Sequence, residues 1–227
     1  MTRIHRWLLA MLATTGLALP LTADAAQGLG FYVGALAGYS ELGVSEGDWA
    51  NAARDAFTAA GGALTSSSLK KDDVAWGLNA GFQLMRFFAI EADYYDLGKA
   101  KPAASGTVLT PNGTVPATLN GEFKSSGPAA ALVFILPLDK LALDARVGGY
   151  YGKTELTASA SGSGASATAS QSKSEASLLA GAGVAWLFND YLSLRLDYLY
   201  FDKVGDKATT GQANVNVVSL GVRFHFL

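Results

Sequence analysis

The sequence has 227 residues, with 17 Lys or Arg against 19 Asp or Glu, a pI near 5.7 and a mean hydropathy of +0.22. This charge balance excludes a nucleic-acid-binding protein that depends on neutralising phosphates, so we expect no nucleic-acid partner. The chain has no cysteine, which excludes disulfides, thiolate metal sites and cysteine nucleophiles. Half of the residues are apolar, too many for a disordered chain.

Residues 1–25 have the three zones of a secretory signal peptide. Arg3 and Arg6 precede an apolar run over 7–21, and Ala23-Asp24-Ala25 follows as a small-x-small cleavage site. An uncleaved N-terminal anchor is the alternative. We expect cleavage after residue 25, which makes the mature protein a single domain over 26–227, exported to the periplasm or outer membrane of a bacterium.

After Gly28, apolar and polar residues alternate with period two, the pattern of β-strands. Eight such segments follow one another, at about 29–40, 74–86, 88–100, 122–136, 141–156, 175–188, 191–204 and 212–227. They run to roughly 11–16 residues, longer than the usual strand of five or six and long enough to cross a bilayer at a tilt. The sequence therefore predicts an all-β protein whose strands span a membrane.

The connections between these segments alternate in length. Long ones cover about 41–73, 101–121, 157–174 and 205–211, whereas the three between them are tight turns. Short periplasmic turns and long extracellular loops are typical of an outer-membrane barrel. Because unpaired backbone groups are costly in hydrocarbon, we predict that the eight strands close into an antiparallel up-and-down β-barrel.

Two of the long connections carry local signals. In the first, Ser45-x-x-Asp48 predicts a helix start and Gly61-Gly62 a stop, so we expect a short amphipathic helix at about 46–60. It could lie on the barrel mouth or the outer leaflet, or simply pack the loop. The third long connection is rich in Ser, Ala and Gly, and we expect it to be mobile or an extended hairpin.

The large apolar side chains fall on one face of each segment and the glycines and charges on the other. A soluble periplasmic sandwich or a lipocalin-like barrel would also alternate, with its apolar face inside. We favour the membrane barrel, with aromatic girdles at both interfaces. The expected girdle residues are Phe31, Tyr39, Phe87, Phe88, Tyr94, Tyr95, Tyr150, Tyr151, Trp186, Phe188, Tyr191, Tyr198, Tyr200, Phe224 and Phe226.

Five stretches resemble the eight-stranded transmembrane domain of the OmpA family and, more loosely, OmpX-type small barrels. They are GFYVGALAGYS (30–40), EADYYDLG (91–98), LALDARVGGYY (141–151), LRLDYLYFDKVGD (194–206) and SLGVRFHF (219–226). The family resemblance implies an outer-membrane location among lipids and lipopolysaccharide, and a monomeric barrel. In OmpA itself a periplasmic peptidoglycan-binding domain follows, which is not expected here.

Charges at membrane depth must face the interior and pair with one another. We therefore expect an ionic network inside the barrel, made of Glu91, Asp93, Asp144, Arg146, Arg195, Asp197 and Arg223. The resemblance implies that four of these, Glu91, Arg146, Arg195 and Asp197, occupy places where the family keeps such a network. Leu36, Val133 and Ala185 stand where the family has further charges, so we expect a partly apolar, packed interior rather than a water-filled conduit.

The last segment looks like the C-terminal signal that the barrel assembly machinery reads, in Ser219, Gly221, Phe224 and Phe226. Leu227 follows the final Phe and departs from that pattern. The alternative is that both Phe side chains simply face lipid. The resemblance thus implies the assembly machinery and periplasmic chaperones as partners during biogenesis, and a host or envelope factor at the loops.

We expect no enzyme, no cofactor and no metal site. Barrel enzymes generally need a His near the outer loops, but His5 lies in the signal peptide and His225 near the periplasmic end of the last strand. The adjacent Asp72 and Asp73 are more typical of a solvated surface than of a cation site. A structural or surface-interaction role is the leading hypothesis, with a narrow porin as the second and a lipid-modifying enzyme as the third.

Overall fold

The computed structural model describes residues 30–111, 113–162 and 165–226. The expected signal peptide and Leu227 lie outside them. The elements are β1 (Gly30–Leu42), α2 (Glu46–Ala59), β2 (Ala63–Lys70), β3 (Asp72–Met85), β4 (Phe88–Thr110), β5 (Gly113–Leu138), β6 (Leu141–Gly162), β7 (Ala165–Leu187), β8 (Leu192–Val204) and β9 (Ala213–Phe226). Among the described residues, no helix has the length and apolar character to cross a membrane.

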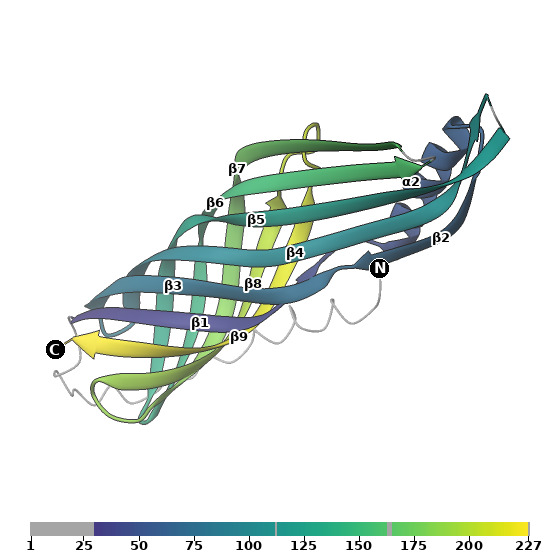
Figure 1. Ribbon diagram of the computed structural model, residues 1–227. Coiled ribbons are helices and arrows are strands. Elements are labelled where there is room, and N and C mark those ends of the chain that lie inside the picture. Colours follow the sequence, from purple (N-terminus) through teal and green to yellow (C-terminus); the bar gives the residue numbers. More distant parts are fainter. Residues whose placement is uncertain (1–29, 112, 163–164, 227) are drawn as a thin grey trace, which may run out of the picture.

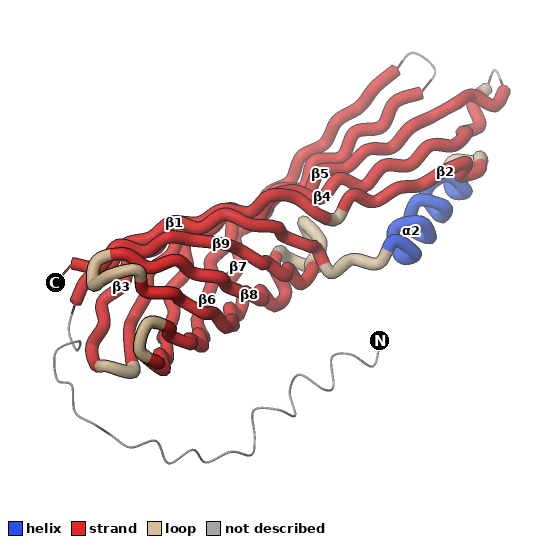
Figure 2. Tube along the Cα trace, turned by 90° about the horizontal axis from the view of Figure 1, so that it is seen from below, coloured by secondary structure: helices blue, strands red, loops and turns tan. Residues whose placement is uncertain are grey.

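Eight strands close into the predicted antiparallel barrel (Figures 1 and 2). The described strands pair with their sequence neighbours from β3 to β9, and β1 closes the ring by pairing with both β3 and β9. In the closing register Ala35 lies opposite Val222, and Tyr39 opposite Val218. Closure leaves no unpaired edge within the barrel wall, as a hydrocarbon environment requires.

The alternation of the sequence sets the two faces of the wall. Leu196 and Val218 point outward and are about half exposed, at 54% and 50%, whereas their neighbours Asp197 and Ser219 are buried inside. Outward-facing aliphatic and aromatic side chains around an interior of charges, glycines and packed aromatics are the arrangement of a membrane barrel. A soluble barrel would show the opposite arrangement, so this structure contradicts the lipocalin-like alternative.

The expected loop at 101–121 is wrong, because strands run through it, whereas the segment 157–174 forms the extended hairpin that was one of its two alternatives. β4 continues to Thr110 and β5 begins at Gly113, while β6 reaches Gly162 and β7 begins at Ala165. A further strand, β2, lies within the first expected loop and pairs with β4. Ser, Thr, Ala and Val suit a pleated sheet, and pairing with neighbours satisfies the backbone of segments whose composition alone is typical of a linker.

The strand extensions, together with β2 and α2, form a sheet that projects from one side of the barrel rim, at the end away from the short turns (Figures 1 and 2). We call it the blade. It consists of α2, β2, and residues 101–110 of β4, 113–123 of β5, 153–162 of β6 and 165–177 of β7. Because short turns mark the periplasmic end of such barrels, the blade lies on the extracellular side.

The helix α2 forms where Ser45 and the following apolar spacing predict it. The Ser45 side chain accepts a hydrogen bond from the Gly47 amide, and the helix ends before Gly61, whose φ is 69°. Phe57 is buried on β4 and β5, and the Trp49 indole donates to the Ala103 carbonyl at 3.2 Å. The helix therefore packs against the blade, as in the alternative that it simply packs the loop.

Replacing Ser45 with Ala removes this N-cap and should destabilise α2 by about 1 kcal/mol. The amides of the first helical turn should then exchange with deuterium roughly fivefold faster, since that free energy corresponds to such a factor. Hydrogen-exchange mass spectrometry of the folded barrel measures this. Exchange in β8 and β9 serves as the internal control and should stay unchanged; a change there as well would contradict a purely local role.

Candidate functional site

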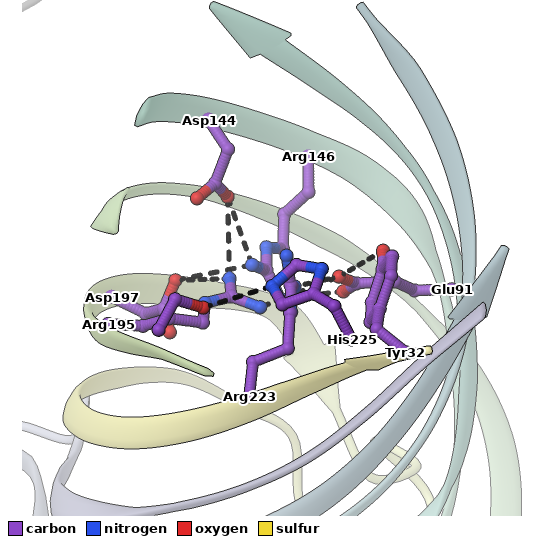
Figure 3. A network of polar contacts seen from close by, with 9 residues as sticks. Tyr32, Glu91, Asp144, Arg146, Arg195, Asp197, Arg223 and His225 are labelled. Atoms are coloured by element: carbon purple, nitrogen blue, oxygen red, sulfur yellow. Dashed lines mark hydrogen bonds and ion pairs between the residues drawn. The ribbon is translucent and has the colours of Figure 1, made fainter. Parts of the chain in front are cut away.

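The barrel interior holds a layer of charged side chains, shown from close by in Figure 3. It lies in the half of the barrel nearer the short turns, because Glu91 follows the start of β4 closely and Arg223 is close to the end of β9. The side chains come from four strands, and several are spaced two residues apart, which places them on the same inward face of a strand. β4 supplies Glu91, β6 supplies Asp144 and Arg146, β8 supplies Arg195 and Asp197, and β9 supplies Arg223. All six are at least nine-tenths buried.

Glu91 is the centre of this layer. Its carboxylate accepts from Arg146 at 3.1 Å, from Arg195 at 3.4 Å and from Arg223. The Tyr32 hydroxyl donates a fourth hydrogen bond, at 2.7 Å. A single fully buried carboxylate thus ties together strands β1, β4, β6, β8 and β9 (Figure 3).

Two further carboxylates complete the pairing of the guanidinium groups. Asp197 accepts from Arg195 at 2.6 Å and from Arg146 at 3.2 Å. Asp144 accepts from the same two arginines, at 3.4 Å and 3.0 Å. Charge-assisted hydrogen bonds of this kind are the strong ones in a low-dielectric interior. Six of the seven residues expected inside the barrel therefore lie in one network.

Asp93, the seventh, is buried but stands apart. Both of its carboxylate oxygens lack a hydrogen-bond partner within the described parts of the chain. Among the described residues, the buried charged groups of the barrel interior are four carboxylates and three guanidinium groups. The network proper, without Asp93, pairs three with three, so removing any one member leaves an opposite charge uncompensated.

Tyr32 belongs to the network and is absent from the sequence-based expectation. Besides bonding Glu91, its ring lies under the Arg223 guanidinium, with 3.9 Å between Cζ and the ring centroid. Gly81 makes room for that ring, because a Cβ there would lie 2.1 Å from the Tyr32 ring. The alternation contained the signal: Phe31 faces outward, so its neighbour must face inward.

Apolar layers lie on both sides of the charged layer. Toward the periplasm, Tyr32 packs with Ala89 and Val133, and toward the blade a larger cluster contains Leu36, Leu199 and Phe201. Leu36, Val133 and Ala185, which replace expected family charges, are all buried in the interior. The interior is thus packed in three layers, apolar, ionic and apolar.

Two residues of the expected aromatic girdle, Tyr95 and Tyr150, lie inside the barrel instead. Both are buried at 2% exposure or less, and their rings pack edge-on against Phe201 at 5.3 and 5.1 Å between centroids. Their chain neighbours Tyr94 and Tyr151 are the ones that face outward. Two adjacent strand residues cannot share a face, so each Tyr-Tyr pair supplies one girdle residue and one interior residue.

His225 lies at the periplasmic end of β9, where its Nε2 is 3.2 Å from the Ser193 hydroxyl. A Ser–His pair is part of many hydrolytic sites, but it also needs an accessible nucleophile and a group that orients the imidazole. Ser193 is 2% exposed, and His225 has no carboxylate partner among the described contacts. This contact connects β8 with β9 at the periplasmic end of the barrel.

The loop between β8 and β9, at the extracellular mouth, is ordered by Asp206. Its carboxylate accepts from the Thr209 hydroxyl and from the Ala208 amide at 3.2 Å, while its own amide donates to Thr210 at 3.0 Å. The Thr209 hydrogen bond, followed by the backbone ones, lowers the pKa of Asp206 from its usual value. The ionised carboxylate is the form that holds the turn.

An NMR titration of Asp206 should therefore have its midpoint below that of an ordinary aspartate. Because the folded pKa is lowered, the stabilisation of the turn is present above the usual aspartate pKa and is lost as the pH falls through the lowered one. Thr209→Val removes the largest cause and should move the midpoint back upward. An unchanged midpoint in that variant would show that the hydroxyl does not set it.

The candidate assembly signal lies on β9 as the alternation requires. Ser219 and Gly221 face the interior, whereas Phe224 and Phe226 face outward and stack edge-on at 5.1 Å. Their outward position suits contact with lipid. Leu227 lies outside the described residues.

Comparison with known proteins gives the family and relatives of this chain. The model of the OmpA-like transmembrane domain matches residues 26–227. "Outer membrane protein A" of Serratia marcescens is 27% identical over 158 residues, which cover 69% of this chain and 40% of that protein. The chain thus spans less than half the length of this relative.

Among solved structures, similarity extends over most of the chain. Ail of Yersinia pestis, in complex with the heparin analogue sucrose octasulfate, is 17% identical with a TM-score of 0.47, covering 87% of this chain and 99% of that one. OprG of Pseudomonas aeruginosa is 10% identical with a TM-score of 0.45, covering 88% and 98%.

Proposed function

Because the chain belongs to the family of OmpA-like transmembrane domains and is a protein of the Gram-negative outer membrane, we propose that it is a structural and surface-interaction protein rather than a pore. The observation that carries this proposal is the filled interior. The ionic network around Glu91 lies between two apolar layers. Such a plug fixes the strands against one another and offers ions no continuous polar path.

The blade supports the second half of the proposal. It presents a five-stranded sheet and a helix outside the barrel. Beside α2 lies an open, largely apolar hollow of about 380 Å³, lined by Phe57, Val108 and Leu119 among others. Exposed segments held on a rigid scaffold are the common location of binding function.

Planar-bilayer recordings of the purified barrel test the proposal. We expect no stable channels at moderate voltage, from either the native protein or a variant whose blade strands are replaced by short turns. Cells that display the truncated variant should lose loop-dependent adhesion while the barrel stays heat-modifiable on gels. Stable channels whose selectivity changes in Arg195→Ala would instead support the narrow porin.

We also propose that residues 1–25 are a cleaved export signal and that Phe224 and Phe226 serve the assembly machinery. N-terminal sequencing of the outer-membrane form should start at Ala26. Phe226→Ala should lower the yield of folded barrel in cells while leaving refolding from urea into detergent nearly intact. Equal losses in both settings would indicate a packing role alone.

No enzymatic activity is part of this proposal. The residues of the described chain offer the Ser193–His225 pair only at the periplasmic end, and Ser193 is buried. A lipid-modifying enzyme would change the mass of lipid A when the protein is expressed, and we expect an unchanged mass spectrum.

A further inference from the structure

One edge of the blade is open along its length. Residues 165–177 of β7 pair with β6 on one side, and within the described residues the pairing with β8 begins only at Leu178. The free edge of an exposed strand presents a row of unpaired N–H and C=O groups that can bind another strand. The opposite edge of the sheet, β2, is shorter, at 8 residues.

This edge has few of the features that usually prevent pairing. Its sequence ASATASQSKSEAS contains no proline and no glycine, and its pairing with β6 continues without a bulge. Only Lys173 and Glu175 are charged, and they pair with one another at 3.7 Å. The remaining side chains are small, so another strand can approach closely.

The face pointing away from α2 carries a row of hydroxyl groups across the blade. In register, the row runs from Ser66 through Ser105, Thr118 and Ser161 to Ser166. The hydroxyl oxygens of Ser66 and Ser105 form a hydrogen bond of 2.8 Å. Those of Thr118 and Ser161 form one of 2.7 Å. The row ends at the free edge, where Ser166, Thr168, Ser170, Ser172 and Ser174 alternate along β7.

We propose that this edge binds the same edge of a second copy of the chain, antiparallel, about a two-fold axis at Ser170. In that register Ser166 lies opposite Ser174, and Thr168 opposite Ser172, so every pair on this face joins two hydroxyls. On the other face Lys173 lies opposite Ala167, and no like charges meet. Cross-strand Ser and Thr pairs stabilise such sheets.

The direction of β7 determines where the second copy sits. In each copy β7 runs from the tip of the blade toward the barrel. An antiparallel partner therefore has its barrel at the opposite end of the joint sheet, which requires a second, facing membrane. The contact leaves each barrel a monomer in its own membrane and makes the chain a homophilic cell-to-cell adhesin. This inference rests on the proposed surface-interaction role and names its partner.

A single cysteine tests the register, because the native chain has none. Opposed residues in antiparallel strands have Cα atoms about 4.5–5.5 Å apart, within disulfide range. Ser170→Cys, with one barrel per lipid nanodisc, should form a disulfide-linked pair that joins two discs under mild oxidation. Ser166→Cys is the matched control, since its twin would lie eight residues away, roughly 26 Å.

Mixing discs that carry Ser166→Cys with discs that carry Ser174→Cys should restore the cross-link. We expect the Ser170→Cys dimer to exceed the Ser166→Cys dimer at least tenfold. Equal cross-linking at both positions would indicate random collision, and no cross-link at Ser170 in a heat-modifiable barrel would show that the edges do not pair. Either result overturns the homophilic contact.

Charge exchange supplies a second test that does not depend on cysteine. Vesicles carrying Thr168→Lys with Ser172→Lys should fail to cluster, because the new charges oppose each other across the axis. Mixing them with vesicles carrying Thr168→Glu with Ser172→Glu should restore clustering, which a misfolded variant would not do. Failure of the rescue contradicts this contact alone, whereas channel activity in bilayers would contradict the proposed function.

Discussion

Replacing Glu91 with Gln should lower the free energy of unfolding by about 3–5 kcal/mol, the usual cost of breaking a buried ion pair from one side. Glu91 accepts hydrogen bonds from Arg146, Arg195 and Arg223 and is fully buried. The neutral amide keeps the volume but leaves three guanidinium groups facing two paired carboxylates. Urea unfolding from lipid vesicles, followed by tryptophan fluorescence, measures the loss.

Asp93→Asn is the matched control for this experiment. Asp93 lies two residues after Glu91 on the same face of β4 and is also buried. Its carboxylate, however, has no hydrogen-bond partner among the described residues. Removing its charge should therefore be nearly neutral or stabilising. If the two variants lost equal stability, burial rather than the network would account for the cost, and the central role of Glu91 would be wrong.

The alternation of apolar and polar residues was sufficient to predict the barrel, because one face of its wall contacts lipid and the other face contacts the barrel interior. Residues such as Leu196 and Asp197 must point to opposite sides, and only one side can hold a charge. The same constraint selected the interior residues individually, including Arg146 and Arg223. It could not give their partners, because contacts across the barrel depend on the tilt and stagger of the strands.

The sheet of the blade was not predicted as a whole, although an extended hairpin at 157–174 was one alternative, and the reason is physical. Its strands are rich in Ser, Ala and Gly, a composition shared with flexible linkers, and neither of their faces meets lipid. What makes them strands is pairing with neighbours more distant in sequence, as in Ser66 with Ser105 and Thr118 with Ser161. The helix α2 was predictable because its cap and its apolar spacing are local.

The filled interior and the blade belong to one mechanical arrangement. Three of the barrel strands that contribute to the ionic network, β4, β6 and β8, alternate with β5 and β7, and four of these five continue into the blade. The network therefore fixes the relative positions of strands that carry the exposed sheet. A barrel with an open lumen would hold that sheet less rigidly, which is why a plug suits a surface scaffold.

Phe201→Ala should be the most destabilising change in the apolar layer, at about 3–5 kcal/mol for a large side chain removed from a packed core. Phe201 is fully buried and packs edge-on against both Tyr95 and Tyr150. Its loss leaves a cavity on the extracellular side of the charged layer. The same urea titration in vesicles measures the cost.

Conductance should nevertheless stay absent in Phe201→Ala, because the ionic layer below the cavity remains intact. Tyr150→Phe is the mild control: it keeps the ring and removes the hydroxyl that lies 3.1 Å from Ser125, so it should cost only about 1 kcal/mol. Channels appearing in Phe201→Ala alone would show that the aromatic cluster, and not the network around Glu91, closes the barrel.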